Sequence, residues 1–247
     1  MSAPVFFADR AALLAGRTVV LDGAEGRHAA VVRRTRAGEP VVLTDGAGLA
    51  VEGVVARVER DRLVVDVVAV SELARPQPGV TVAQALPKGD RAELAVEALT
   101  EVGVDRVVPW AATRAVTRWR DDRGEKALER WRSTAREAAK QSRRTWWPAV
   151  DPLAVTADVV RLLEAAALGL VLHEEAATPI GAVAVPAAGE VVVVVGPEGG
   201  ITPEELAAFE AAGARLVRLG PTVLRTSTAG AVAAGVLLAT TARWRAG

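Results

Sequence analysis

Five consecutive valines, Val191–Val195, are the feature that most constrains how this chain can fold. An uninterrupted apolar run of this kind is typical of a strand buried on both faces, as in the centre of a parallel sheet. The run ends at Gly196-Pro197, a dipeptide that favours a turn, and two more glycines follow at positions 199 and 200. A loop whose residues lack a Cβ lets a ligand approach the backbone closely.

The residues after this loop predict the start of a helix. Thr202 is a favourable N-cap, Pro203 occupies the first helical position, and Glu205 completes a capping box with Thr202. In an open α/β sheet, ligands bind where a strand, a glycine loop and a helix start follow one another. An ordinary tight turn explains the same residues about equally well, so the loop alone leaves both interpretations open.

The composition excludes several kinds of site. The 247 residues contain no cysteine, which excludes disulfides, thiolate metal sites and cysteine nucleophiles. His28 and His173 are the only histidines, too few for a histidine-based metal site, so we expect no metal. We see no signal peptide at the N-terminus and no apolar run of membrane-spanning length, so we expect a soluble, cytoplasmic protein that does not use a membrane.

Positive charge is concentrated in one segment although the net charge is zero. Residues 114–144 contain 11 Lys and Arg against 5 Asp and Glu. Of the 30 basic residues 27 are Arg, a side chain suited to bidentate phosphate contacts. Compositional bias explains the proportion of arginine but not its clustering, so the segment is a candidate phosphate-facing surface.

The first 73 residues have the pattern of a small β domain, with turn signals such as Asp45-Gly46 between short apolar runs. The predicted strands are Val5–Phe7, Thr18–Leu21, Pro40–Thr44, Leu49–Val58 and Leu63–Val70. One helix, predicted over Glu25–Arg36, carries several arginines. A small barrel with a basic helix suggests RNA binding, whereas a solvated helix face is the simpler explanation for any single arginine.

Residues 74–79 contain two prolines and a glycine and are the predicted linker. Strands and helices alternate after it, which predicts a parallel α/β sheet over residues 80–247. The predicted strands are Val80–Leu86, Arg106–Trp110, Leu168–Leu172, the valine run and Arg215–Leu219. The predicted helices are Arg91–Val102, Glu125–Arg144, Val159–Ala167, Pro203–Ala212 and Thr226 to about Trp244.

Three loops follow three consecutive predicted strands of this second domain. They begin at His173, Gly196 and Gly220. Because the carboxyl ends of parallel strands meet at one edge of a sheet, we expect the loops to form one pocket. Arg225 is the one charge in the third loop, and either an anionic ligand or a structural salt bridge explains it.

Several common motifs are absent, and one helix has an unusual composition. The chain has neither a P-loop nor a dinucleotide fingerprint, which argues against a nucleotide hydrolase and against a dehydrogenase. The helix that begins at Thr226 consists almost entirely of small residues. We expect another helix, such as one from a second subunit, to pack closely against it.

Two motifs together resemble one known family. GPEGGITPEE at 196–205 and LGPTVLRTSTAG at 219–230 resemble the RsmE family of 16S ribosomal RNA (uracil-N3)-methyltransferases, in the SPOUT superfamily. Residues 84–110, 129–148 and 28–34 are similar to further blocks of that family, so the resemblance covers the whole chain. Ser227 stands where the commonest family form has Glu, and Thr222 where it often has Arg. A role of that Glu therefore cannot be carried over.

The resemblance implies a fold and an activity. The fold would be a SPOUT-type α/β domain with a deep trefoil knot, preceded by a PUA-like RNA-binding barrel, in a homodimer. The activity would be methylation of N3 of a specific uridine, uridine 1498, in the 16S rRNA of the small ribosomal subunit. S-adenosylmethionine would be the cofactor. The residues expected to bind it are Leu172, His173, Glu174, Gly196, Pro197, Gly199, Gly200, Leu219, Gly220, Leu224, Thr226, Thr228 and Ala229.

Roles in chemistry and RNA binding follow from the same resemblance. Arg225 is predicted to stabilise negative charge on the uracil carbonyl oxygens. Glu198 is the first candidate for the general base and Glu174 the second. The residues expected to contact RNA are His28, Arg33, Arg34, Arg114, Arg118, Arg132, Arg143 and Arg144. Two alternatives stay open: a ribose 2′-O methyltransferase of the same superfamily, and a non-catalytic ribosome-assembly factor, for which Ser227 is the only indication.

Overall fold

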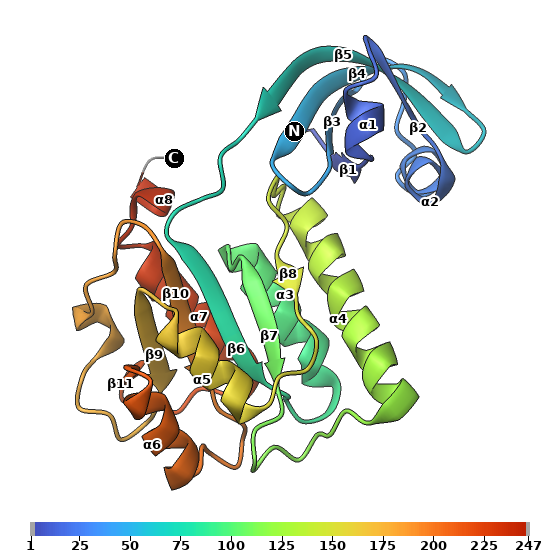
Figure 1. Cartoon of the computed structure of the whole chain (residues 1–247). Coiled ribbons are helices and arrows are strands. Elements are labelled where there is room, and N and C mark those ends of the chain that lie inside the picture. Colours follow the sequence, from blue (N-terminus) through green and yellow to red (C-terminus); the bar gives the residue numbers. More distant parts are fainter. Residues whose placement is uncertain (1–2, 246–247) are drawn as a thin grey trace. The chain divides into compact units, whose positions relative to one another are not determined.

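The computed structural model describes residues 3–245, apart from the side chain of Asp90. The chain forms two compact units, each built around one sheet (Figure 1). The first unit comprises the residues up to 75 together with 139–147, and the second comprises 76–138 together with the residues from 148 onward.

The first unit contains a five-stranded sheet with the order β1-β3-β4-β5-β2. Its strands are β1 (Val5–Phe7), β2 (Thr18–Leu21), β3 (Pro40–Thr44), β4 (Leu49–Glu59) and β5 (Arg62–Glu72). The pairs are antiparallel except for β1 with β3. Two irregularities in the register of β4 against β5 bend these long strands, which Figure 1 shows as a curved ribbon. The sheet therefore curls around a core that includes Phe6, Leu43 and Leu63.

The helical segment of this unit is shorter than predicted. After α1 (Arg10–Leu13) and β2, helix α2 spans Gly23–Arg27 and continues as a π-helical turn, η1 (His28–Val32). Arg34 has a φ of 56°, which is incompatible with a right-handed helix. Arg33 and Arg34, expected on the helix, therefore lie just beyond its end.

Residues 139–147 return to the first unit and complete it. Lys140 Nζ donates to Glu25 Oε1 at 2.7 Å, and Lys140 is only 8% exposed. The rings of Trp146 and Trp147 pack against the glycines of the turn at 46–48, where added Cβ atoms would lie 2.6 and 2.7 Å from them. The sequence did not indicate this return, because the prediction continued one long basic helix to Arg144, whereas the helix ends at Gln141.

The second unit contains a six-stranded sheet with the order β11-β9-β10-β6-β7-β8, and every neighbouring pair is parallel. Its strands are β6 (Gly79–Ala85), β7 (Arg106–Trp110), β8 (Ala149–Val150), β9 (Leu168–Leu172), β10 (Glu190–Val195) and β11 (Arg215–Val217). The valine run is β10, between β9 and β6, so the prediction of a central parallel strand is confirmed. The short β8 was not predicted.

Helices cover both faces of this sheet (Figure 1). One face carries α3 (Ala92–Val102), the part of α4 (Asp121–Gln141) in this unit, and α7 (Thr226–Leu238). The other carries α5 (Thr156–Glu164) and α6 (Pro203–Ala211). Val191, Val193 and Val195 belong to the first of these cores, and Val192 and Val194 to the second. Both faces of β10 are thus buried, which is why no polar residue interrupts the run.

The last predicted helix is divided. Helix α7 ends at Leu238, and a separate α8 spans Ala242–Arg245. The hydroxyls of Thr240 and Thr241 each donate at 2.7 Å to a carbonyl three residues earlier, in the last turn of α7. These side chains satisfy helix-end carbonyls locally, so they favour a stop at this point. Within residues 3–245, no helix is both long and apolar enough to cross a membrane.

Candidate active site

The loops that follow β9, β10 and β11 line a pocket of about 660 Å³. A volume of this size suits a small-molecule ligand. Every residue predicted to bind the cofactor lines this pocket except Thr228, whose hydroxyl donates at 3.3 Å to the carbonyl oxygen of Arg225, the N-cap of its helix. Glu198 and Arg225, the catalytic candidates, line the pocket, and so do Arg114 and Glu174. All of these residues belong to the second unit.

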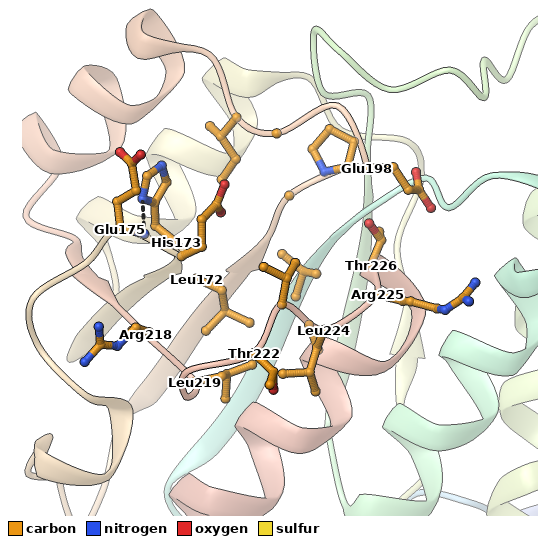
Figure 2. Close-up of a pocket in the computed structure, with 18 of the residues that line it drawn as sticks. Leu172, His173, Glu175, Glu198, Arg218, Leu219, Thr222, Leu224, Arg225 and Thr226 are labelled. Carbon is orange, nitrogen blue, oxygen red and sulfur yellow. Dashed lines mark hydrogen bonds between the residues drawn. The ribbon is translucent and has the colours of Figure 1, made fainter.

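The pocket has an apolar interior and polar sides. Figure 2 shows Leu172, Leu219 and Leu224 gathered at its centre, the first from the end of β9 and the other two from the chain after β11. Apolar side chains of this size suit a flat, weakly polar group such as a nucleobase.

Polar and charged groups lie on two opposite sides of these leucines (Figure 2). On one side are His173, Glu175 and Arg218, where His173 Nδ1 accepts from Glu175 N at 3.3 Å. On the other side are Glu198 and Arg225. The two catalytic candidates are therefore on the same side of the pocket.

Glu198 connects two loops at the carboxyl edge of the sheet. Its Oε1 accepts from the backbone N of Lys88 at 3.2 Å. Lys88 lies in the loop between β6 and α3, outside the three loops that we predicted to converge. This contact engages one oxygen of the carboxylate, and among the described residues the other oxygen accepts no hydrogen bond.

The glycine loop, residues 196–200, packs against the segment that follows β7. A Cβ added at Gly199 would lie 2.9 Å from Arg114 O and 3.0 Å from Arg114 Cβ. A Cβ at Gly196 would lie 2.7 Å from the side chain of Ile201, and Gly200 has a φ of 76°. A different constraint therefore favours glycine at each of these positions. At Gly199 the constraint is close packing within the protein and not ligand approach alone.

The predicted capping box at the start of α6 is present and extends further than predicted. Thr202 Oγ1 accepts from Glu205 N at 3.2 Å, and Glu205 Oε2 accepts from Thr202 N at 3.0 Å. Glu205 Oε1 also accepts from both N and Oγ1 of Thr113 at 2.9 Å, and from Thr156 Oγ1 at 3.2 Å. The side chain therefore joins the start of α6 to two other segments.

Glu205 is 4% exposed and its charge is stabilised by these donors. Burial opposes ionisation, but hydrogen bonds from Thr202, Thr113 and Thr156 outweigh that effect and hold the pKa of Glu205 below its ordinary value. The carboxylate is ionised at neutral pH as a consequence.

A buried glutamine supports the start of α7, immediately after Arg225. Gln84, in the middle of the sheet on β6, donates from Nε2 to Thr226 O at 3.1 Å and to Ala85 O at 3.0 Å. Ser227, the departure from the family form, is 1% exposed, and its hydroxyl has no hydrogen-bond partner among the described residues. Sequence reasoning missed Gln84, although an amide within a buried strand was a possible signal.

The residues expected to contact RNA are divided between the two units. His28, Arg33, Arg34, Arg143 and Arg144 belong to the first, and Arg114, Arg118 and Arg132 to the second. Those with exposed side chains are Arg33, Arg34, Arg114, Arg118 and Arg143.

Four of the arginines expected to contact RNA also have partners within the protein, and one of them, Arg114, reaches Gly199 O with Nη1 at 3.5 Å. Arg118 donates to the carbonyls of residues 112 and 113, at 2.9 and 2.8 Å. Arg132 pairs with Glu129, and Arg144 Nε donates to Trp146 O at 2.9 Å. The described residues contain no group of three or more His, Cys, Asp or Glu side chains that could hold a metal ion.

Comparison with known proteins decides the family. A family model for an RNA methyltransferase domain matches residues 75–238, and one for an RNA methyltransferase PUA domain matches residues 21–68. The chain is 50% identical over 235 residues to "Ribosomal RNA small subunit methyltransferase E" of Mycobacterium bovis, which covers 94% of this chain and 90% of that protein. The chain belongs to the small-subunit methyltransferase E family.

More distant members of the methyltransferase E family are similar to this chain over most of their length. The protein of that name from Bacillus subtilis is 29% identical over 220 residues, 86% of each chain. A crystal structure of the methyltransferase E from Neisseria gonorrhoeae, bound to S-adenosyl methionine, matches with a TM-score of 0.83 and 28% identity. That match covers 96% of this chain and 98% of the other.

Proposed function

We propose that this protein transfers a methyl group from S-adenosylmethionine to N3 of one uridine in the 16S rRNA of the small ribosomal subunit. The observation that carries the proposal is the pocket lined by both family motifs, at 196–200 and 219–226, in a chain half identical to a methyltransferase E. The cofactor named with the Neisseria structure supports the methyl donor. The position of the uridine, 1498, follows from the family resemblance.

The residues of the pocket fit this cofactor. Leu172, Leu219 and Leu224 would pack against its adenine, and the backbone of the glycine loop would face its polar parts. A Cβ added at Gly220 would meet no atom within 4 Å, so the space above this backbone is open to a ligand. When bound, the cofactor supplies a methyl group activated by its sulfonium charge.

Arg225 and Glu198 would act on the uracil. Methylation of N3 removes the imide proton and leaves negative charge on the flanking carbonyl oxygens. Arg225 would stabilise that charge, and Glu198 would accept the proton from N3 through the oxygen that does not bond to Lys88. Their position on one side of the pocket supports assigning both to the same base.

The finer architecture belongs to the same proposal. Residues 1–73 would form a PUA-like RNA-binding barrel, 74–79 a linker, and 80–247 a SPOUT domain with a trefoil knot. Two chains would pair as a homodimer through the small-residue helix α7, on which Val232 is 42% exposed and before which Val223 is 81% exposed. The protein would act in the cytoplasm, where small subunits are assembled.

The test is methyl transfer from labelled S-adenosylmethionine to small ribosomal subunits from cells that lack this gene. We expect N3-methyluridine in the digested RNA. A 2′-O-methylated nucleoside would support the ribose methyltransferase instead. No transfer and no binding of S-adenosylmethionine in calorimetry would support the non-catalytic assembly factor.

Arg225→Ala tests the role of the arginine in the same assay. We expect kcat to fall about 10²-fold or more, as when one group that stabilises developing negative charge is lost. Calorimetry should show an unchanged Kd for S-adenosylmethionine, because the Arg225 side chain points away from the leucines (Figure 2). A variant with the wild-type kcat would remove Arg225 from the proposed chemistry.

A further inference from the structure

The carboxylate of Glu205 does more than cap its own helix. A capping box needs one bond from the Glu side chain to the backbone of the N-cap residue, and Glu205 Oε2 supplies that bond to Thr202. The other oxygen, Oε1, accepts two hydrogen bonds from Thr113, one from its backbone and one from its hydroxyl. One oxygen of this buried carboxylate therefore bonds mainly to Thr113, a residue 92 positions away in sequence.

This segment carries Arg114 to the pocket. The residue after Thr113 is in contact with Gly199, where an added Cβ would lie 2.9 Å from Arg114 O. Its guanidinium reaches Gly199 O at 3.5 Å and lines the pocket. Two contacts therefore determine the position of Arg114: the bonds from Thr113 to Glu205 and the packing against the glycine loop.

The Arg114 side chain is exposed and suited to an external anion. Among the described residues no carboxylate lies within 4.0 Å of it, although Glu204 attracts it electrostatically. Arg114 also opens the basic segment 114–144. It enters the pocket from the β7 side of the sheet, whereas the three predicted cofactor loops follow β9, β10 and β11. An RNA strand that approaches from the β7 side would meet Arg114 first.

We infer that Glu205 is a positioning residue for RNA: through Thr113 it holds Arg114 at the pocket, where the guanidinium contacts a phosphate beside the target base. The inference rests on the proposed function, since it assumes that the pocket receives an RNA strand. The helix cap does not need the two hydrogen bonds from Thr113, and these bonds instead fix the segment that carries Arg114.

The experiment measures the affinity of the full-length protein for small ribosomal subunits from cells lacking this gene, by filter binding over 50–200 mM KCl. The slope of log Kd against log salt reports the number of phosphate contacts, about 0.7–0.9 for each contact. We expect Arg114→Gln to reduce the slope by about this amount. Glu205→Gln should reduce it similarly, and should add nothing in the Arg114→Gln background.

A pair of threonine variants provides the matched control. Thr113→Val removes the hydroxyl bond to Glu205 Oε1 and should reduce the slope, because Arg114 is then held less firmly. Thr156→Val removes a bond to the same oxygen from α5, which does not carry Arg114, and should leave the slope unchanged. Thr113→Val keeps the test decisive even if Glu205→Gln fails to fold.

Separate results would overturn the inference and the proposed function. An unchanged slope in Arg114→Gln, equal slopes in the two threonine variants, or an additive effect of Glu205→Gln in the Arg114→Gln background would each refute the positioning role. The proposed function is tested separately, by identifying the methylated nucleoside after methyl transfer. The binding measurements do not depend on that result.

Discussion

Two of the loops that line the pocket differ in how the protein holds them. The glycine loop, 196–200, is fixed by Arg114, by the bond from Lys88 to Glu198, and by the capping box that follows it. The arginine loop, 220–225, is exposed at all but two positions, with Val223 at 81%. Within residues 3–245, no side chain of the arginine loop makes a hydrogen bond or an ion pair.

We infer from this difference that the glycine loop is a preformed part of the site and that ligands order the arginine loop. Fixed backbone contributes to catalysis by holding groups in place before the substrate arrives. A loop with few contacts opens at little cost in free energy. We therefore expect the glycine loop to be a fixed reference and the arginine loop to close over the cofactor and the base, which brings Arg225 to its working position.

The largest expected effect comes from Gly199→Ala in the fixed loop. Because the new Cβ would lie 2.9 Å from Arg114 O, backbone on one side has to move. A displacement near 1 Å at a catalytic site can lower kcat/KM about 10²-fold, which the methyl-transfer assay would show. Gly181→Ala is the matched control, because its Cβ meets no atom within 4 Å and Gly181 lies outside the pocket. Wild-type activity in Gly199→Ala would mean that the glycine loop is not fixed.

The next effect concerns stability in acid and depends on Glu205. Its pKa in the folded protein lies below its ordinary value, so the ionised form stabilises the fold above the unfolded-state pKa of about 4.3. That contribution is lost as the pH falls through the folded-state pKa. Urea unfolding from pH 7 to pH 3 should therefore show a smaller acid-induced loss in Glu205→Gln than in the wild type. At neutral pH the variant should be about 1–3 kcal/mol less stable, because donors lose a charged acceptor.

A smaller effect is expected from Thr202→Ala, at the N-cap of α6. The loss of the bond from Glu205 N should lower the free energy of unfolding by about 1 kcal/mol, which the urea midpoint would report. Thr222→Ala, a threonine in the arginine loop, is the matched comparison and should change stability by less than about 0.5 kcal/mol. Equal losses in the two variants would contradict the distinction between the loops.

The smallest effect is expected from Gly220→Ala, at the start of the arginine loop. No atom lies within 4 Å of the added Cβ, so the free energy of unfolding should change by less than about 0.5 kcal/mol. A loss above 1 kcal/mol in the urea midpoint would show that this loop is packed as tightly as the glycine loop.

The sequence allowed the prediction of features that depend on neighbours in the chain. The valine strand, the parallel order of strands after residue 80, and the capping box of Thr202 and Glu205 all have local signals, and all three are present. The meeting of three loops followed from a general property of parallel sheets, and one pocket does contain residues from all three.

Features that depend on contacts distant in sequence were not predictable. Nothing near Glu205 indicates that Thr113 and Thr156 donate to it, and nothing near Gly199 indicates its contact with Arg114. The predicted helix Glu25–Arg36 was too long for a different reason. The conformation of Arg34 ends the helical segment, and a positive φ at an arginine has no sequence signal.

The contribution of residues 139–147 to the first unit sets an order of events during synthesis. The five-stranded sheet is fully translated at residue 72, but Lys140, the partner of Glu25, follows 68 residues later. At 5–20 residues per second, this is a delay of roughly 3–14 s. During that time the nascent sheet lacks two sets of contacts. Lys140 is not yet present to pair with Glu25, and Trp146 and Trp147 are not yet present to pack on the turn at 46–48. The N-terminal unit therefore begins to fold first, yet becomes complete only after more than half of the chain has been made.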